Sequence, residues 1–285
     1  MKFSIVHNPK QKDGWWEIEK LVQAGGDAGC EVEVVPVTAG DIDLEWINSL
    51  GEVVHYWGAG GAQAVDRVLI KKRIAGRGRL INDVMLRQPF LTRKSYQQMV
   101  IQTQTNVTGI PTWRFMDIEQ LRRAVDRGVL KFPFIQKPDV GTRGEGVVVV
   151  RDWDDVDSGR VEKCVFQTFI PNDGDYRVLV VGGKVYGIVK RKAVAGCEVN
   201  NLSQGASGET VTDAELLDQV NVLATDILRE LPYDVVGIDL IKPLDGGPLI
   251  FLEINSVPRW RHFEKASGGD VAKAIIEMVL RLGAE

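Results

Sequence analysis

The sequence predicts an α/β protein with a mostly parallel sheet in its first third and hairpins further along the chain. Up to about residue 75, short runs rich in β-branched residues alternate with helix-like segments, the pattern of βαβ units. Beyond Lys163, apolar runs follow one another with short glycine turns between them, which is typical of antiparallel hairpins. The chain has 285 residues, enough for two or three compact units.

Composition and charge exclude several classes of protein. The net charge is −4, so the chain has no overall basic footprint for nucleic acid. Its apolar runs are far shorter than the roughly 20 residues of a membrane span, and the stretch MKFSIVHNPK lacks the features of a signal peptide. Three scattered cysteines, Cys30, Cys164 and Cys197, do not suit a disulfide framework or a zinc site. We expect a cytoplasmic protein with no nucleic-acid or membrane partner.

The first third is expected to hold three strands, in FSIVHN, EVEVVPV and GEVVHYW. Helices are expected from Trp15 to Ala28 and from Gln63 to Ala75. A dinucleotide-binding fold needs a glycine-rich phosphate fingerprint after its first strand, and none is present here. The later stretch WGAGGAQ lacks the full spacing, and we interpret it as a turn before a helix. A redox Rossmann enzyme is therefore disfavoured.

The remaining elements follow from the same patterns. Phe115 to Val150 is expected to form helix, strand, glycine loop and strand, and Gly182-Gly183 separates the two strands of a hairpin. The stretches CVFQTFI, VVGIDLIKP and PLIFLEIN are further expected strands, the last two joined by the turn LDGG. Helices are expected at Thr92–Thr105, Asp213–Leu231 and Asp270–Leu282.

The stretch FIQKPDVGTRGEGVVVV is the first with chemical content. A strand ends at Lys137, a loop carries Gly141, Gly144 and Gly146, and a valine-rich strand follows. Glycines let backbone N–H groups approach phosphate oxygens closely, and a lysine supplies a point charge for them. This is not a Walker A loop, because the lysine precedes the glycines and no helix follows. A plain hairpin turn is the alternative.

Polar residues end two neighbouring apolar strands near the C-terminus. Glu253 and Asn255 are two residues apart, so they project from the same face of a strand. If the preceding strand pairs with this one as a hairpin, Asp239 can face Glu253 across it. Three oxygen donors of this kind suit Mg²⁺, and two close carboxylates repel without a cation between them. The alternative is a set of polar groups at a solvent-exposed strand end.

A third cluster is cationic. Arg177 opens one strand of the Gly182-Gly183 hairpin, while Lys190, Arg191 and Lys192 close the other. Because the chain reverses direction in a hairpin, these charges gather at one end. A solvated sheet edge is the ordinary alternative.

In their order and spacing, these clusters resemble the ATP-grasp superfamily, specifically its RimK-type branch of carboxylate–amine ligases. The resemblance runs from about Ile81 to the C-terminus. It implies an ATP-grasp fold with a Rossmann-like parallel-sheet domain at residues 1–90 that precedes the nucleotide-binding lobes. A small lobe at 91–168 and a large lobe with the metal site at 169–285, both α+β, would enclose the nucleotide.

The resemblance also assigns site residues. The stretches LTRKSYQQMVIQTQTNVTGIP, IQKPDVGTRGEGV and VFQTFIPNDGDYRV are similar to the family's ATP-binding segments, KRKAVAGCEVNNLSQGA to its phosphate-facing segment, and GIDL with FLEINSVP to its metal strands. The implied nucleotide-binding residues are Lys94, Lys137, Gly141, Thr142, Gly144, Gly146, Gln167, Thr168, Phe169, Ile170 and Asp175. The implied catalytic residues are Arg177, Arg191 and Asn201, the last in an Asn201-Leu202 pair. The implied metal ligands are Asp239, Glu253 and Asn255.

This chain departs from the family pattern at two places. Gln167-Thr168-Phe169 stands where relatives often have Gln-Glu-Tyr, and Arg259-Trp260-Arg261 stands where they have glycine and smaller residues. We hypothesise that Arg259 and Arg261 grip an anionic substrate, because guanidinium groups suit carboxylates; solvated loop arginines are the alternative. His262 is expected to be an exposed loop residue.

The implied activity joins a carboxylate to an amine at the expense of ATP. The carboxylate attacks the γ-phosphate to give an acyl phosphate and ADP, and the amine then displaces phosphate. One or two Mg²⁺ ions, replaceable by Mn²⁺, are the expected metal. The partners would be a small-molecule, peptide or carrier-protein carboxylate and an amine such as an amino acid, bound by a homo-oligomer. A kinase on the same scaffold and a non-catalytic nucleotide-binding module are the alternatives.

Overall fold

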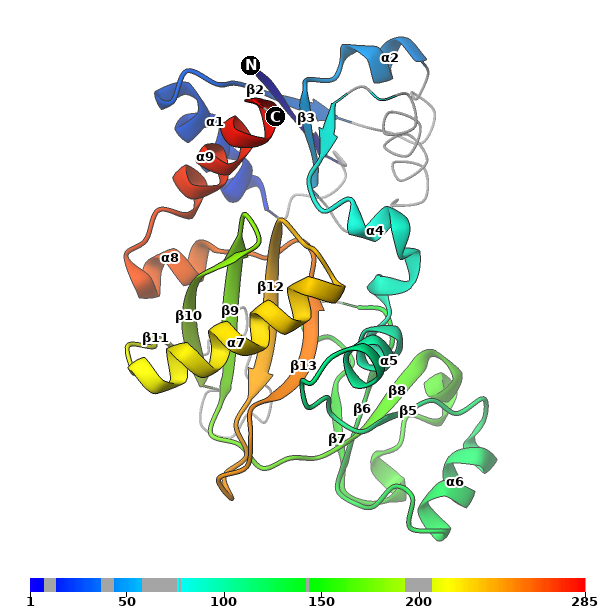
Figure 1. The fold of residues 1–285 in the computed structure, drawn as a ribbon. Coiled ribbons are helices and arrows are strands. Elements are labelled where there is room, and N and C mark those ends of the chain that lie inside the picture. Colours follow the sequence, from blue (N-terminus) through cyan, green and yellow to red (C-terminus); the bar gives the residue numbers. More distant parts are fainter. Residues whose placement is uncertain are drawn as a thin grey trace.

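The computed structural model describes residues 1–7, 14–36, 44–57, 76, 78–141, 144–192 and 207–284. Their strands form three separate sheets, which follow one another from top to bottom of the molecule in Figure 1. The helix expected from Gln63 to Ala75 and the glycines of WGAGGAQ lie outside the described residues. None of the described helices has the length and hydropathy of a membrane span.

The first sheet is the parallel one. Its strands are β1 (Lys2–His7), β2 (Glu31–Pro36), β3 (Val53–Trp57) and β4 (Arg79–Leu80), in the order β2-β1-β3-β4. All its pairings are parallel, as the alternating pattern predicted. Helices α1 (Trp15–Asp27) and α2 (Leu44–Ser49) connect these strands, and the C-terminal helix α9 (Val271–Ala284) packs against α1. The two chain ends therefore lie close together (Figure 1).

The second sheet is small and antiparallel. It contains β5 (Thr112–Trp113), β8 (Cys164–Thr168), β6 (Phe134–Pro138) and β7 (Val148–Val150), in the order β5-β8-β6-β7. Helix α6 (Ile118–Asp126) covers it together with the short 3₁₀ turns η2 (Trp153–Asp155) and η3 (Ser158–Lys163). Helix α4 (Val84–Arg87), the turn η1 (Pro89–Thr92) and helix α5 (Lys94–Gln104) lead into this sheet from the first one.

The third sheet has five strands in the order β11-β10-β9-β12-β13 and is antiparallel. These are β9 (Asp175–Val181), β10 (Lys184–Lys192), β11 (Ser207–Thr210), β12 (Val235–Ile241) and β13 (Ile250–Asn255). Helix α7 (Ala214–Glu230) crosses one face, and α8 (Arg261–Ser267) lies beside β10 and β11 (Figure 1). Gly182 and Gly183 join β9 to β10 with φ of 63° and 71°, as a two-residue hairpin turn requires.

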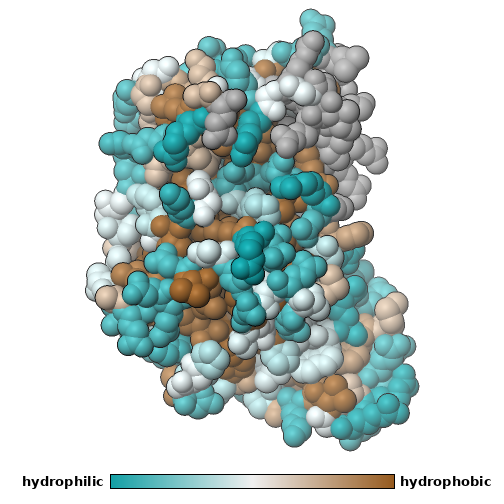
Figure 2. Space-filling model, in the orientation of Figure 1, coloured by the Kyte–Doolittle hydropathy of each residue, from teal (hydrophilic) through white to brown (hydrophobic). Residues whose placement is uncertain are grey.

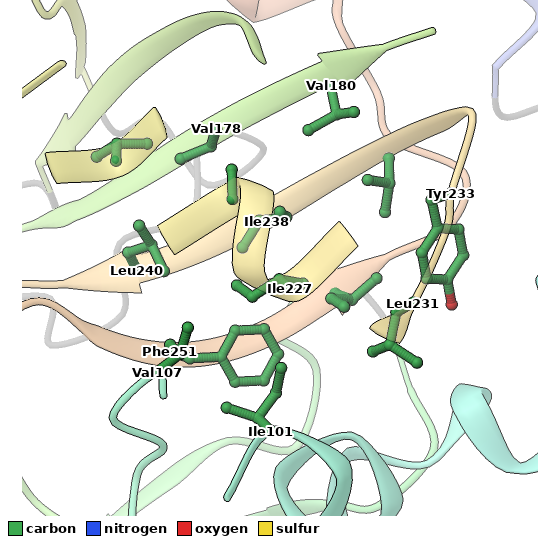
Figure 3. Close-up of a cluster of buried hydrophobic side chains, with 14 of the residues drawn as sticks. Ile101, Val107, Val178, Val180, Ile227, Leu231, Tyr233, Ile238, Leu240 and Phe251 are labelled. Atoms are coloured by element: carbon green, nitrogen blue, oxygen red, sulfur yellow. The ribbon is translucent and has the colours of Figure 1, made fainter. Parts of the chain in front are cut away.

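The largest buried cluster lies on the third sheet. Side chains of α7, such as Ile227, meet those of β9 and β12, and Ile101 of α5 and Val107 join them next to Phe251 (Figure 3). The surface, by contrast, is mixed: hydrophilic residues surround smaller groups of apolar ones on the face in Figure 2. Helix α5 thus packs on β13 of the third sheet, although the expected division at residues 90 and 168 assigns it to the small lobe. That division stays a prediction.

Candidate active site

A cavity of about 210 Å³ lies between the second and third sheets. Helix α5 and strands β6 and β8 supply its wall on one side, and β9, β10, β12 and β13 supply the other. The structure brings together in this cavity the predicted residues Lys94, Lys137, Gly141, Gly144, Gln167, Thr168, Phe169, Ile170, Asp175, Arg177, Arg191, Asp239, Glu253 and Asn255. Thr142 and Asn201 lie outside the described residues. Gly146 does not line the cavity and lies against Arg160 and Pro138.

The predicted metal ligands lie side by side. Strands β12 and β13 pair as an antiparallel hairpin that sets Asp239 opposite Glu253 and Gly237 opposite Asn255. The Asn255 amide donates a hydrogen bond to Asp239 Oδ2 at 3.0 Å. The strand pairing therefore gathers two carboxylates and one amide on one side of the sheet.

Two arginines neutralise Asp239. Arg177, opposite it on β9, places Nε 2.7 Å from Asp239 Oδ1, and Arg191 places a terminal nitrogen 3.2 Å from the same oxygen. Arg191 also donates from Nε to Asp175 Oδ1 at 2.6 Å. Each of these side chains is largely buried. The cluster is thus an alternating network of acids and bases, in which burial is tolerated because each charge is paired.

Two lysines approach Glu253 from the other side of the cavity. The Nζ atoms of Lys94 and Lys137 lie 3.7 Å and 3.6 Å from Glu253 Oε2, and Lys94 also donates to the Gly141 carbonyl at 2.9 Å. Lys94 begins α5 and Lys137 lies in β6. Glu253 therefore connects the third sheet to the lysines that the sequence assigns to phosphate binding.

Burial and these charges shift several pKa values. Burial favours a higher pKa for Glu253, but the charges of Lys137 and Lys94 outweigh it and hold that pKa below its ordinary value. Burial lowers the pKa of Lys137, although Glu253 opposes the shift. Burial also raises the pKa of Asp175 to about 6, despite the nearby charge of Arg191. Glu253 is accordingly ionised at neutral pH.

The donor set fits a hard divalent cation. Ionised carboxylates and an amide oxygen are the ligand types that Mg²⁺ takes in proteins. The described residues contain no cluster of three or more His, Cys, Asp and Glu suited to a metal; the predicted ligands are two carboxylates and one amide. The acids are at present paired with bases, and a cation among them would compete with Arg177 for Asp239.

The comparisons with known proteins agree with this geometry. A model of the RimK-like ATP-grasp domain matches residues 81–279, more than half of the chain. The chain belongs to the RimK-like ATP-grasp family. Its probable alpha-L-glutamate ligase relatives include one from Pseudoalteromonas atlantica, 26% identical over 99% of this chain and 96% of that protein. Another, from Aliivibrio fischeri, is 27% identical over 100% of this chain and 97% of that protein.

Solved structures confirm the predicted ATP-grasp fold. The D-alanine–D-alanine ligase of Bacillus anthracis, solved with ATP, has a TM-score of 0.75 and 15% identity, over 100% of this chain and 97% of that one. The ATP-grasp ligase PsnB, solved with a minimal precursor, Mg and ADP, has a TM-score of 0.73 and 16% identity. That match covers 99% of this chain and 98% of PsnB.

Sequence reasoning missed a glycine in this RimK-like site. A Cβ at Gly237 would lie 2.4 Å from a terminal nitrogen of Arg177, so only a residue without a side chain lets that guanidinium lie across β12. The signal was present, since an isolated glycine inside an apolar strand commonly marks a close approach.

It also missed residues that hold α5 in place. The buried carboxylate of Asp139 accepts from Ser95 N at 2.8 Å and from Ser95 Oγ at 3.0 Å, at the start of α5. Gln97 and Gln98 are buried as well and bond to the backbone of β13. No periodicity or motif in the sequence indicates these roles of Asp139, Gln97 and Gln98, because their contacts join segments far apart in the chain.

The residues after Asn255 do not belong to the cavity wall. Arg259 places a terminal nitrogen 3.7 Å from Glu17 and lies over the ring of Trp57 at 5.8 Å, and Arg261 lies over the ring of Trp16 at 5.6 Å. Trp260, which separates them in the sequence, is buried and its ring packs against Trp57. These contacts join the segment at the start of α8 to helix α1 and strand β3, and neither arginine lines the cavity.

Proposed function

We propose that this protein is an ATP-dependent carboxylate–amine ligase that forms an amide bond through an acyl phosphate, releasing ADP and phosphate. The observation that carries the proposal is the cavity itself. In a chain of the RimK-like ATP-grasp family, Lys94, Lys137, Arg177 and Arg191 converge on the same space as Asp239, Glu253 and Asn255.

The charge pattern suits the reaction. A carboxylate and a triphosphate repel, so positive charge is needed where they meet. Lys94 and Lys137 stand on one side of the cavity, and Arg177 and Arg191 on the other. Because phosphoryl transfer depends on positioning and charge compensation, the site needs no nucleophilic serine or cysteine.

The apolar side chains in the cavity wall suit an adenine ring. Ile110, Ile135, Val147 and Leu252 line the cavity, as do residues 168–170, whose backbone the family resemblance assigns to adenine. Asp239, Glu253 and Asn255 would hold Mg²⁺, or Mn²⁺ in its place. When bound, the ion would supply positive charge that offsets the charge of the phosphates.

We infer that the amine is an amino acid and that L-glutamate is the first one to test, because the relatives matched along their whole length are named probable alpha-L-glutamate ligases. A peptide or carrier-protein carboxylate is the alternative partner for the acyl phosphate; PsnB, the similar structure, was solved with a precursor. A cytoplasmic setting and a homo-oligomer remain predictions from the sequence.

Trapping with hydroxylamine tests this function. The protein is incubated with ATP, Mg²⁺ and candidate carboxylates, and hydroxamate and ADP are measured. An acyl phosphate gives a hydroxamate, whereas a kinase that phosphorylates a hydroxyl gives ADP without one. ADP release with no hydroxamate, for every carboxylate that supports release, would refute the ligase proposal.

Two variants test the metal ligands. Glu253→Gln and Asp239→Asn keep the side-chain shape but remove one carboxylate each, so we expect turnover to fall by at least about 100-fold. Each variant also removes the countercharge of two buried bases, so we expect the fold to be kept with a lower stability. Far-ultraviolet circular dichroism and thermal unfolding check the fold. Full activity in either variant would remove that residue from the site.

A further inference from the structure

Strand β13 carries two of the predicted metal ligands at the edge of its sheet. On the side of β13 that faces away from β12, the backbone of Phe251 pairs with residues 108–110 as it would with a strand. Phe251 N donates to Thr108 O at 2.9 Å, and Phe251 O accepts from Ile110 N at 3.3 Å. Past Phe251, no strand among the described residues continues along this edge. Backbone groups that are buried without partners destabilise a fold, so something else has to pair with them.

Helix α5 provides that pairing through Gln97. The side chain is 3% exposed, and its amide contacts both backbone groups of Ile254. Gln97 Oε1 accepts from Ile254 N at 2.8 Å, and Nε2 donates to Ile254 O at 3.1 Å and to Leu91 O at 2.7 Å. One carboxamide thus replaces the donor and the acceptor that a neighbouring strand would present.

The position of this contact matters because β13 is irregular just before it. The pairing with β12 shifts between Asp239, opposite Glu253, and Leu240, opposite Phe251, so Leu252 is the extra residue of a β-bulge. Leu252 and Glu253 consequently both line the cavity, while Phe251 and Ile254 belong to the buried cluster on the other face. Without the bulge, strict alternation would turn Glu253 away from the cavity.

We propose that Gln97 is a positioning residue for the metal site, which fixes the register of β13 after the bulge and so holds Glu253 and Asn255 toward Lys94. Ile254 lies between those two ligands, and Lys94 begins the helix that carries Gln97, one turn earlier. The proposal rests on the proposed function, since it deepens the role of the same site.

Gln98, next to it on α5, shows the difference between positioning and simple burial. Its Nε2 donates to Phe251 O at 3.1 Å and Leu252 O at 2.9 Å, on the other side of the bulge, and its Oε1 has no hydrogen-bond partner among the described residues. On β13, Gln98 therefore bonds to carbonyl groups of two residues, whereas Gln97 bonds to both the N–H and the carbonyl of a single residue, Ile254. Mutation of a residue that orients metal ligands without touching the metal typically changes metal affinity by about 10–100-fold.

The test compares Gln97→Met with Ile101→Val in the full chain. Both residues are buried on α5, but Ile101→Val removes packing and leaves all hydrogen bonds to β13. Binding of a non-hydrolysable ATP analogue is measured by calorimetry with and without Mg²⁺, and exchange of the Ile254 amide proton is followed by NMR in the free protein. If Gln97→Met does not fold, Gln97→Glu replaces it, since a carboxylate can still accept from Ile254 N but cannot donate to the two carbonyls.

We expect the Gln97 variant to lose about tenfold in Mg²⁺-dependent affinity, with metal-free affinity unchanged and faster exchange at Ile254. Ile101→Val should change neither quantity. Mg²⁺-dependent affinity and exchange equal to those of Ile101→Val would overturn the inference. Failure of the wild-type protein to bind the analogue in a Mg²⁺-dependent way would instead count against the proposed function.

Discussion

At the scale of single residues, the site depends on charges that are buried only because they are paired. Asp239 lies between Arg177 and Arg191, and Glu253 lies between Lys94 and Lys137. Strand alternation and hairpin pairing predicted the acids and the arginines, the glycine loop pointed to Lys137, and the family resemblance implied Lys94. It did not predict the bulge at Leu252, since a bulge depends on the pairing of two strands rather than on the pattern within one.

His55 is a buried titratable residue away from this site. It is 2% exposed, neither ring nitrogen has a hydrogen-bond partner in the part of the chain that the structure describes, and burial lowers its pKa to about 3. In the unfolded chain a histidine binds a proton below about pH 6.5. As the pH falls from there toward 3, the unfolded state is therefore favoured by about 1.4 kcal/mol per pH unit from this one group.

We therefore predict that His55→Phe reduces the loss of unfolding free energy on acidification between about pH 6 and 4. The aromatic ring keeps the edge contact with Trp57, whose ring centroid lies 5.1 Å away, and removes the titration. Urea unfolding at several pH values gives the slope. Equal slopes for the variant and the wild type would show that His55 does not titrate differently in the two states.

At the scale of elements, α5 is the part that connects the two walls of the cavity. Its first turn is held by Asp139, which follows Lys137 and β6, and its middle is held to β13 by Gln97. The sequence predicted the helix and its early lysine. It could not predict these attachments, because they join positions 44 and 157 residues apart.

We predict that Asp139→Ala destabilises the fold by about 1–3 kcal/mol, because it leaves the Ser95 N–H and hydroxyl without their acceptor. It should also raise the KM for ATP, since Lys94 begins the helix that Asp139 holds. Chemical unfolding and steady-state kinetics measure the two effects.

Asp139→Asn is the matched control, because its amide oxygen can still accept from Ser95 N. We expect it to recover most of the lost stability. A stability for Asp139→Ala equal to that of the wild type would show that the start of α5 is held by other contacts.

At the scale of the whole molecule, Asn82 joins the first sheet to the third. Its backbone is left-handed, with φ of 60°, and its side chain accepts from the N–H groups of Asp234 and Val235. It also donates to the carbonyls of Val235 and Ser256, at 2.6 Å and 3.1 Å. Asparagine tolerates this backbone conformation better than most residues, which explains why this type occupies the junction.

We predict that Asn82→Ala costs about 2–4 kcal/mol of unfolding free energy through lost hydrogen bonds and an unfavourable left-handed backbone. Asn82→Gly separates the two causes, since glycine accepts the backbone conformation but makes none of the side-chain bonds. A glycine variant as stable as the wild type would mean that the side chain does not join the sheets.

The sequence also predicted the larger plan: a parallel sheet first, then antiparallel strands with a glycine hairpin, and a family whose fold the solved structures confirm. The hypothesis that Arg259 and Arg261 bind an anionic substrate stays a prediction; in the structure they contact Glu17 and Trp16 of α1 and Trp57 of β3. Long-range packing of this kind leaves no periodic signal in the chain.

The central claim is that a substrate carboxylate attacks the γ-phosphate of ATP in this cavity. Its most direct test is oxygen-isotope transfer, with the substrate carboxylate labelled with oxygen-18 and the products analysed by mass spectrometry. We predict that one labelled oxygen appears in each orthophosphate released and that the nucleotide product is ADP. Label in AMP, or orthophosphate without label while the amide is formed, would contradict the account.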